Sequence, residues 1–365
     1  MYVLQQRTLS PAVTLEIPEA RYQELRQARA VLSSALAFEQ RYELLIGNFI
    51  ALELALTQVC LRATVEPQYG YSDAARVIED ANRHFVNLLT VMRGYCDQVQ
   101  QDFKVLKVTP SFKDMAKDEL RQAYGRSSDF RFMDSLRNYV QHKATAVHSC
   151  QMDAERESDP SSWADAMKFY ANKDELSADK DFKLRVLDEQ PKKIDLRRSA
   201  RRAVEEYGAV HISLRRRASG EVSRSRATVE MAIKDYKLAG AETAVGLAAR
   251  LAGDVSADVP LLLEWDDVRV QLTEKNRAIA RLWRRAQPNQ PKPTELVALR
   301  ESLNQTQEEA AKSVFLSSER WRDYEDGLPM PIGLYHLYQL QAGAHPTHEL
   351  QPLKELLVDA NKLSM

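Results

Sequence analysis

The chain has 365 residues, with 51 lysines and arginines against 52 aspartates and glutamates, a net charge of −1 and 44% hydrophobic residues. This length exceeds one compact domain, so two domains are expected. The opening residues lack the apolar core of a signal peptide, and no uninterrupted run of about 18 apolar residues occurs. These features predict a cytoplasmic protein without a membrane partner.

The composition also argues against several kinds of site. The three cysteines, Cys60, Cys96 and Cys150, lie far apart without ligand spacing, which predicts reduced thiols and no metal site. No P-loop, glycine-rich dinucleotide turn or Ser-His-Asp set is recognisable, so no cofactor is expected. His84 and His211 stand alone in helical sequence, which favours a structural role for both.

Glycine is scarce, with 12 in the whole chain, and long tracts of Ala, Leu, Glu, Arg and Gln predict an all-α protein. The first ten residues are expected to be extended. Helices are expected over residues 18–37, 38–63, 73–105 and 111–124, from 130, from 163, and over 194–238 and 260–286. Residues 151–162 are predicted to form a loop, and the Ala- and Gly-rich residues 239–257 would pack closely as a helix.

The helix expected from Phe130 contains the sequence Arg137-Asn138-Tyr-Val-Gln-His142. An arginine, a polar residue directly after it, and a histidine after four intervening residues resemble the motif of the HEPN family of helical proteins. The resemblance implies a HEPN-like helical domain over residues 1–286 that acts as a homodimer. Many HEPN proteins are metal-independent endoribonucleases, so RNA is the implied substrate.

These residue types suit RNA cleavage without a metal. A histidine side chain can transfer the protons of the 2′-OH and of the leaving oxygen, and an arginine is a preferred clamp for phosphate oxygens. Asn138 and His142 are four residues apart and share a helix face, so the amide can orient the imidazole. Arg137 lies roughly 140° around the helix from His142, and a dimer can supply the arginine in trans. The predicted catalytic set is Arg137, Asn138 and His142.

A plainer interpretation of the same residues stays open. His142 would be a surface histidine, with Arg137 paired to Asp134 or to another carboxylate. Gln141 and His148 would be simple solvent contacts. Non-catalytic HEPN proteins are common as well, so ribonuclease activity is a hypothesis at this point.

Basic residues are concentrated in one part of the chain. Residues 192–226 hold eleven basic and four acidic side chains, a local balance of +7. Such asymmetry favours an anionic partner, for example RNA. The alternative is a helix face whose charges find partners elsewhere in the fold.

A linker is predicted over residues 287–293. Three prolines occur in these seven residues, and proline cannot continue a helix. Residues 294–365 therefore form the second predicted domain.

Two short helices joined by a tight turn are predicted within this second domain. Thr306 and Glu309 have the spacing of a capping box. Ser317 is the predicted N-cap of the following helix, and Gly327 stands where a left-handed C-cap is expected. Trp321 is expected to face the core, together with the tyrosine three residues later.

This pattern, with Ala310-Ala311 in the first helix and Trp-x-x-Tyr-Glu-x-Gly ending the second, resembles the helix-turn-helix of the phage-repressor (Cro, Xre-type) family over residues 294–346. That family usually has a glycine or another small residue at the turn, where this chain has Phe315. The resemblance implies a homodimer that binds DNA in the major groove. The implied DNA contacts are Ser318, Glu319 and Arg322 to bases and Gln307 to a phosphate.

The charge of this segment opposes a simple DNA-binding interpretation. Residues 294–346 carry four basic and eight acidic side chains, a balance of −4. That sign is unfavourable for a contact dominated by phosphates. Docking to another protein, or a helical domain without DNA binding, is therefore an alternative.

The sequence thus predicts an all-α protein with a large HEPN-like helical bundle followed by a small repressor-type helix-turn-helix domain. The two resemblances favour a toxin-like or phage-defence ribonuclease that also binds DNA, with an antitoxin as a further partner. One alternative is a non-enzymatic transcription regulator whose helical domain dimerises or senses a ligand. The other is a pure interaction scaffold.

Overall fold

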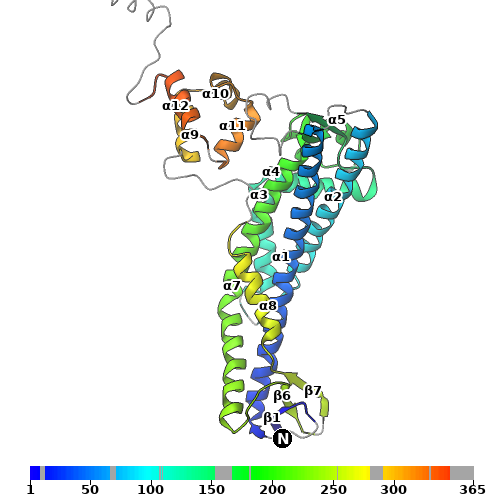
Figure 1. Cartoon of the computed structure of the whole chain (residues 1–365), viewed down its shortest axis with the longest axis vertical. Coiled ribbons are helices and arrows are strands. Elements are labelled where there is room, and N and C mark those ends of the chain that lie inside the picture. Colours follow the sequence, from blue (N-terminus) through cyan, green and yellow to red (C-terminus); the bar gives the residue numbers. More distant parts are fainter. Residues whose placement is uncertain are drawn as a thin grey trace, which may run out of the picture. The chain divides into compact units, whose positions relative to one another are not determined.

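The structure is a computed structural model that describes residues 1–8, 13–65, 71–106, 108, 110–152, 167–180, 182–252, 254–279, 291–328 and 330–345. The chain divides into two compact units, unit 1 over residues 1–280 and unit 2 over residues 281–365 (Figure 1). The division falls shortly before residue 286, the predicted end of the first domain. Within the predicted linker, residues 287–290 lie outside the described residues, and Pro293 is the first residue of a helix.

Unit 1 is built from long helices with a small sheet near each end (Figure 1). Its helices are α1 (Glu19–Val65), α2 (Tyr71–Val99), α3 (Phe112–Arg126), α4 (Ser128–His142), α5 (Lys173–Ser177), α6 (Leu184–Asp188), α7 (Leu196–Leu238) and α8 (Glu264–Lys275). Its strands are β1 (Tyr2–Gln6), β2 (Thr14–Ile17), β3 (Ser149–Met152), β4 (Met167–Asn172), β5 (Lys193–Asp195), β6 (Leu247–Leu251) and β7 (Asp254–Pro260). Helix α1 packs against both α2 and α7, and α4 packs against α2 and α7.

Helix α1 is one helix of 47 residues, where two helices were predicted over residues 18–37 and 38–63. No proline or glycine interrupts it before Gly47. Buried leucines continue at helical spacing across the expected break, among them Leu25, Leu32 and Leu45. At 1.5 Å per residue, α1 is about 70 Å long, so a single element connects the two ends of unit 1.

Two small antiparallel sheets correct the all-α prediction. The first has the strand order β2-β1-β6-β7 and the second β3-β4-β5. Strand β1 confirms the extended N-terminus, and its Tyr2 pairs with Leu251 of β6. The helix predicted from 163 is wrong over residues 167–172, which form β4. Residues 239–257, which were expected to pack closely if helical, contain β6 and part of β7. In the predicted loop, the first two residues belong to β3, and residues 153–162 lie outside the described residues.

Strands β4 and β6 were not predicted, although each has a local signal in the sequence. In β4, Met167, Phe169 and Ala171 are buried while the residues between them are partly exposed, which is the alternation of a strand with one face on the core. Gly246, directly before β6, has a φ of +74°, a conformation that glycine adopts readily and that a helix does not contain. Strand β6 pairs with β1, which is remote in sequence, so a local pattern could not reveal the pairing.

By length and composition, residues 19–63 of α1 qualify as a membrane-spanning helix, although 39% of the most apolar window is buried inside unit 1. Glu53 lies within the most apolar stretch of α1, and it bonds to Arg197 and Arg201 of α7. These ion pairs and the buried leucines tie the helix into the bundle.

Unit 2 consists, where described, of α9 (Pro293–Ser302), α10 (Gln307–Ser313), α11 (Ser318–Glu325) and α12 (Ile332–Gln341). The predicted capping box is present. The Glu309 N–H donates to Thr306 Oγ1 at 3.2 Å, and the Thr306 N–H donates to the Glu309 carboxylate at 2.7 Å. Ser317 caps α11 by accepting the Arg320 N–H at 3.1 Å. These contacts confirm the predicted helix starts.

The core of unit 2 forms around an aromatic pair. Trp321 is fully buried and packs edge-on against Tyr338 with ring centroids 4.6 Å apart. Tyr324 is buried beside it, and Gly327 has the left-handed φ of +114° expected of a C-cap. The turn between α10 and α11 is less usual, because Phe315 has a φ of +60° and an 85% exposed side chain. The turn therefore uses the left-handed conformation that favours glycine, with a bulky residue in its place.

Candidate functional site

Helix α4 presents the predicted catalytic residues near its C-terminal end. Ser127 starts the helix by accepting the Phe130 N–H at 3.1 Å, and the helix ends at His142. One face, which includes Leu136, is buried in the bundle. Asn138 and His142 lie away from that face and are exposed.

A pocket of about 140 Å³ lies beside this end of α4. It is lined by α4 and by the chain between α5 and α6, with the residues Ser135, Asn138, Tyr139, His142, Lys143, Asp179, Phe182 and Lys183. Lys143 Nζ lies 3.6 Å from the Asp179 carboxylate, and Lys183 Nζ lies 3.8 Å from Asp134. Within the described residues, the His142 imidazole has no hydrogen-bond partner. The pocket thus combines an imidazole, an amide, a carboxylate and two ammonium groups, and each ammonium group lies within 4 Å of a carboxylate.

Arg137 does not line this pocket. Its Nη1 donates to Asn138 Oδ1 at 3.0 Å, so in this structure Asn138 orients Arg137 and not, as expected, His142. The alternative pairing of Arg137 with Asp134 is also not formed among the described residues, since Asp134 faces Lys183. Two of the three predicted catalytic residues therefore share a pocket, and the arginine lies outside it.

The segment after His142 is held by Asn82, which the sequence analysis did not single out, and by His148. Asn82 of α2 accepts the Val147 N–H at 2.8 Å and donates to the Val147 carbonyl at 3.1 Å. His148 Nδ1 accepts the Asn172 N–H at 3.0 Å, and the His148 side chain is only 4% exposed. The predicted solvent contact of His148 is therefore wrong. The available signal was a polar residue, Asn82, beside the apolar stripe of α2.

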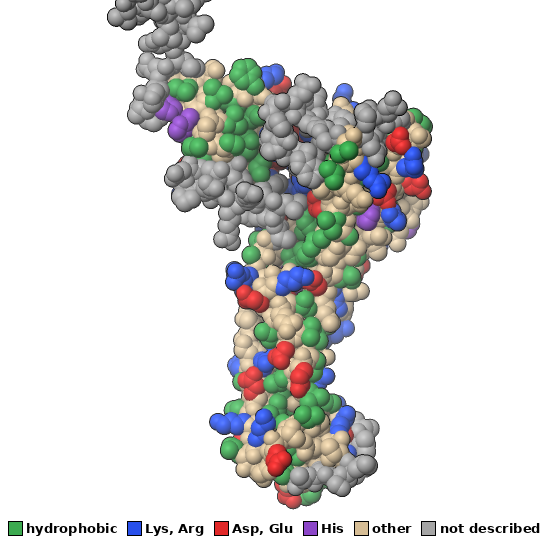
Figure 2. Space-filling view, in the orientation of Figure 1, with side chains coloured by type: hydrophobic (Ala, Val, Ile, Leu, Met, Phe, Trp, Pro, Cys, Tyr) green, Lys and Arg blue, Asp and Glu red, His purple; other side chains and the backbone are tan. Residues whose placement is uncertain are grey.

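The basic tract of residues 192–226 is largely paired within unit 1. Its ion pairs join Arg197 and Arg201 to Glu53, Arg202 to Glu205, Arg215 to Glu39, Arg217 to Glu119, Arg224 to Glu221, and Arg226 to Glu230, Asp266 and Asp267. On the face seen in Figure 2, basic and acidic side chains are interspersed over unit 1. At least seven of its eleven basic side chains therefore have counter-charges within unit 1, which agrees with the alternative interpretation of the tract.

His211 belongs to a buried polar network and does not stand alone. Its ring is fully buried between Phe38 and Tyr42, with centroids 4.1 and 4.2 Å away. His211 Nε2 lies 3.1 Å from the Glu39 carboxylate, and Nδ1 lies 3.1 Å from the Tyr95 hydroxyl. Because a carboxylate only accepts, Nε2–H donates to Glu39 and Nδ1 accepts from Tyr95. The network stabilises the core, which agrees with the predicted structural role.

In unit 2, the outer side of α11 carries two of the predicted DNA contacts. Ser318 and Arg322 are both exposed, and their spacing of four places them on one helix face. Glu319 is partly buried. The opposite face buries Trp321 and Tyr324 in the core, which fixes the rotation of α11 about its axis.

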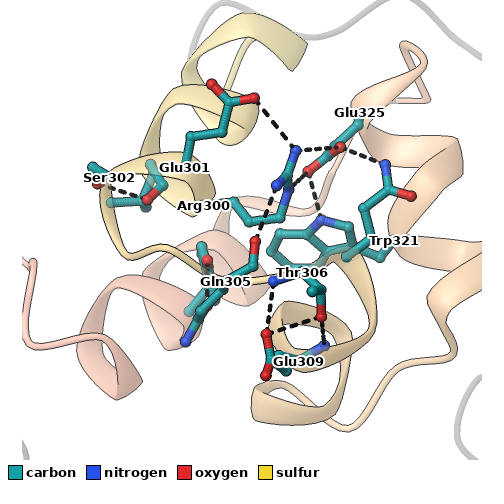
Figure 3. A network of polar contacts seen from close by, with 11 residues as sticks. Arg300, Glu301, Ser302, Gln305, Thr306, Glu309, Trp321 and Glu325 are labelled. Carbon is teal, nitrogen blue, oxygen red and sulfur yellow. Dashed lines mark hydrogen bonds and ion pairs between the residues drawn. The ribbon is translucent and has the colours of Figure 1, made fainter.

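Gln307, the predicted phosphate contact, is engaged within unit 2. Its Nε2 donates to the Glu325 carboxylate at 2.7 Å. Glu325 also accepts from Arg300 Nε at 2.6 Å and from Trp321 Nε1 at 2.7 Å (Figure 3). Burial would raise the pKa of Glu325, but these hydrogen bonds outweigh it and hold the pKa below its usual value. The network ties α9, α10 and α11 together.

No metal site is evident in the part of the chain that the structure describes, where no three His, Cys, Asp or Glu side chains are grouped as ligands. All three cysteines are free thiols. Cys60 is buried, and Cys96 is partly buried.

Comparison with family models, with curated proteins and with solved structures finds no match for this chain. The assignment of function therefore depends on the geometry of the two candidate sites.

Proposed function

We propose that the protein is a DNA-binding regulatory protein whose helix α11 enters the major groove. The observation that carries this proposal is the exposed pair of Ser318 and Arg322 on a helix whose other face is fixed by the buried Trp321. Arginine and serine side chains are common donors to base edges and phosphates in the major groove. The regulator role was the alternative to the ribonuclease in the sequence analysis.

The acidic balance of unit 2 does not prevent this role. Residues 281–292, directly before α9, contain four basic and no acidic side chains. A basic segment beside a helix-turn-helix can contribute phosphate contacts.

Arg322→Ala is expected to weaken binding to the preferred DNA sequence by roughly 5- to 150-fold, the effect of losing a base contact of 1–3 kcal/mol. The preferred duplex is selected from a random pool with the wild-type protein, and Kd is measured at two salt concentrations. Arg277→Ala removes an exposed arginine of unit 1 and serves as the control with unchanged Kd. Selection of no sequence by the wild type, or equal affinity of the Arg322 variant, would contradict DNA reading by α11.

We further propose metal-independent RNA cleavage at the pocket beside α4. The observation that favours it is the shared pocket of Asn138 and His142 with Lys143 and Lys183. The two ammonium groups can hold a phosphate while the imidazole transfers protons. Arg137 would reach the reacting phosphate from a second protomer. The toxin-like or phage-defence role, an antitoxin partner and a cytoplasmic location belong to this second proposal.

His142→Ala is expected to lower the rate of RNA cleavage by at least about 100-fold, because a positioned general acid or base contributes that much or more. The assay follows cleavage of total RNA in the presence of EDTA. His336→Ala, a change at an exposed histidine of unit 2, is the matched control and should leave the rate unchanged. Equal cleavage by both variants, or no cleavage by the folded wild type, would remove the ribonuclease proposal and leave the regulator.

A further inference from the structure

The C-terminal half of α1 exposes apolar side chains that unit 1 does not bury. Leu44, Leu54 and Leu61 are 58%, 66% and 47% exposed. Three further exposed residues lie between them at alternating steps of three and four, so that a seven-residue repeat covers this face. The six residues, named here the α1 seam, are Leu44, Gly47, Ala51, Leu54, Gln58 and Leu61.

The α1 seam carries no charge over its whole length of roughly 26 Å. The acidic residue within this stretch, Glu53, bonds to arginines of α7 on another side of the helix. Apolar side chains are visible over this part of unit 1 in Figure 2. An uncharged apolar face on a helix otherwise packed on α2 and α7 is a typical partner-binding surface.

Gly47 gives an independent indication. A Cβ atom added at Gly47 would meet nothing within 4 Å, so unit 1 itself does not need a glycine there. A glycine inside a helix costs about 0.5–1 kcal/mol relative to alanine. Close approach of a second helix backbone at this point would explain the residue.

We propose that the α1 seam is a homodimer interface in which two copies of α1 pair in antiparallel orientation about a two-fold axis near Leu52 and Glu53. In this register Leu44 lies opposite the partner's Leu61, and Ala51 lies opposite the partner's Leu54. Gly47 lies opposite the partner's Gln58, so each small residue leaves space for a larger one. A parallel pair would set Gly47 against the partner's Gly47, which leaves a void in the seam.

A lipid bilayer is the other candidate for contact with this face, and the residues of the seam favour a helix. Steps of three and four suit knobs-into-holes packing against another helix. Gln58 would place a polar amide in the lipid, and Gly47 would lower helix stability without giving any contact in return. The inference does not depend on either proposed function.

The test measures the molar mass of the full chain by sedimentation across a range of concentrations. The wild type is expected to dimerise. Leu54→Lys and Gly47→Leu are each expected to raise the dimer Kd by about tenfold or more, because charge or bulk enters the packed seam. Leu184→Lys, at a leucine of α6 that is 60% exposed, is the control with unchanged Kd.

Gly47→Leu separates the proposal from non-specific apolar association. The change adds apolar surface, so membrane binding or aggregation would become stronger while a packed helix pair becomes weaker. A monomeric wild type, tighter association of the Gly47→Leu variant, or flotation of the wild-type monomer with phosphatidylcholine vesicles would overturn the proposal.

Cysteine cross-linking tests the orientation. Oxidation of a mixture of Leu44→Cys and Leu61→Cys proteins is expected to give a disulfide between the two variants, identified by mass spectrometry of the joined peptides. Either variant alone should give no such disulfide, because equivalent positions lie roughly 26 Å apart in the antiparallel pair. A disulfide formed by Leu44→Cys alone would overturn the antiparallel arrangement.

Discussion

Replacement of Glu53 by glutamine is expected to lower the free energy of unfolding of unit 1 by about 3–5 kcal/mol. Glu53 Oε2 accepts from Arg197 Nε and Nη2 at 2.9 and 2.8 Å, and Oε1 accepts from Arg201 Nε at 2.8 Å. The Arg197 and Glu53 side chains are only 5% and 12% exposed. The amide keeps the shape of the side chain but removes its charge. Both guanidinium groups then lose the charge of this carboxylate while they stay largely inside the bundle.

Glu274→Gln is the matched control for this change. Glu274 is 72% exposed and pairs with Arg277 at 3.0 Å on the surface of α8. Loss of such an exposed pair changes the free energy of unfolding by less than about 1 kcal/mol. Both variants are unfolded in urea and followed by circular dichroism. Equal, small effects would mean that the Glu53 cluster contributes little to the stability of the bundle.

A loss of stability between pH 6.5 and pH 4 is expected from His211. Burial lowers the pKa of His211 to about 4 in the folded state, although Glu39 acts in the opposite direction. In the unfolded chain the pKa is near the usual value of 6.5. The unfolded state therefore binds more protons in this window, and the folded state loses about 3 kcal/mol as the pH falls through it.

The measurement compares the wild type with His211→Gln, whose side chain does not titrate. The free energy of unfolding of the wild type should fall by about 3 kcal/mol relative to the variant between pH 6.5 and 4. Burial raises the pKa of Asp102 to about 6, which contributes the opposite slope, but Asp102 is present in both proteins and cancels in the comparison. Parallel pH profiles would show that His211 is not the titrating group.

The structure changes the order of the two functions that the sequence favoured. The ribonuclease hypothesis drew on the motif of Arg137 and His142 and on the basic tract. Arg137 lies outside the pocket of its own protomer. Most arginines of the tract are paired within the fold. The helix-turn-helix prediction, in contrast, leads to an exposed face with Ser318 and Arg322 on a well-fixed helix. We therefore prefer the DNA-binding regulator to the ribonuclease as the proposed function.

Much of unit 2 was predictable because its signals are local. Capping residues act on backbone groups two or three positions away, so Thr306, Glu309 and Ser317 could be recognised from spacing alone. The buried Trp321 follows from helical periodicity in the same way. Phe315 shows the limit, since its left-handed backbone follows from the path of the turn and not from the preference of the residue.

The sequence by itself determined where most helices of this protein lie and which of their faces are apolar, because propensity, periodicity and capping act over a few residues. Only the tertiary structure decided which charged side chains are paired within the protein and which are exposed. From the sequence, ligand contacts were considered for the basic tract, which includes Arg197 and Arg215, and for Gln307. Each of these three side chains bonds to a residue of another helix. For the two arginines that residue is more than a hundred positions away in the sequence. The pairing of β6 with the N-terminal strand β1 likewise joins two segments that are far apart in the sequence. Such contacts depend on chain segments that meet only after folding, so no local pattern can encode them.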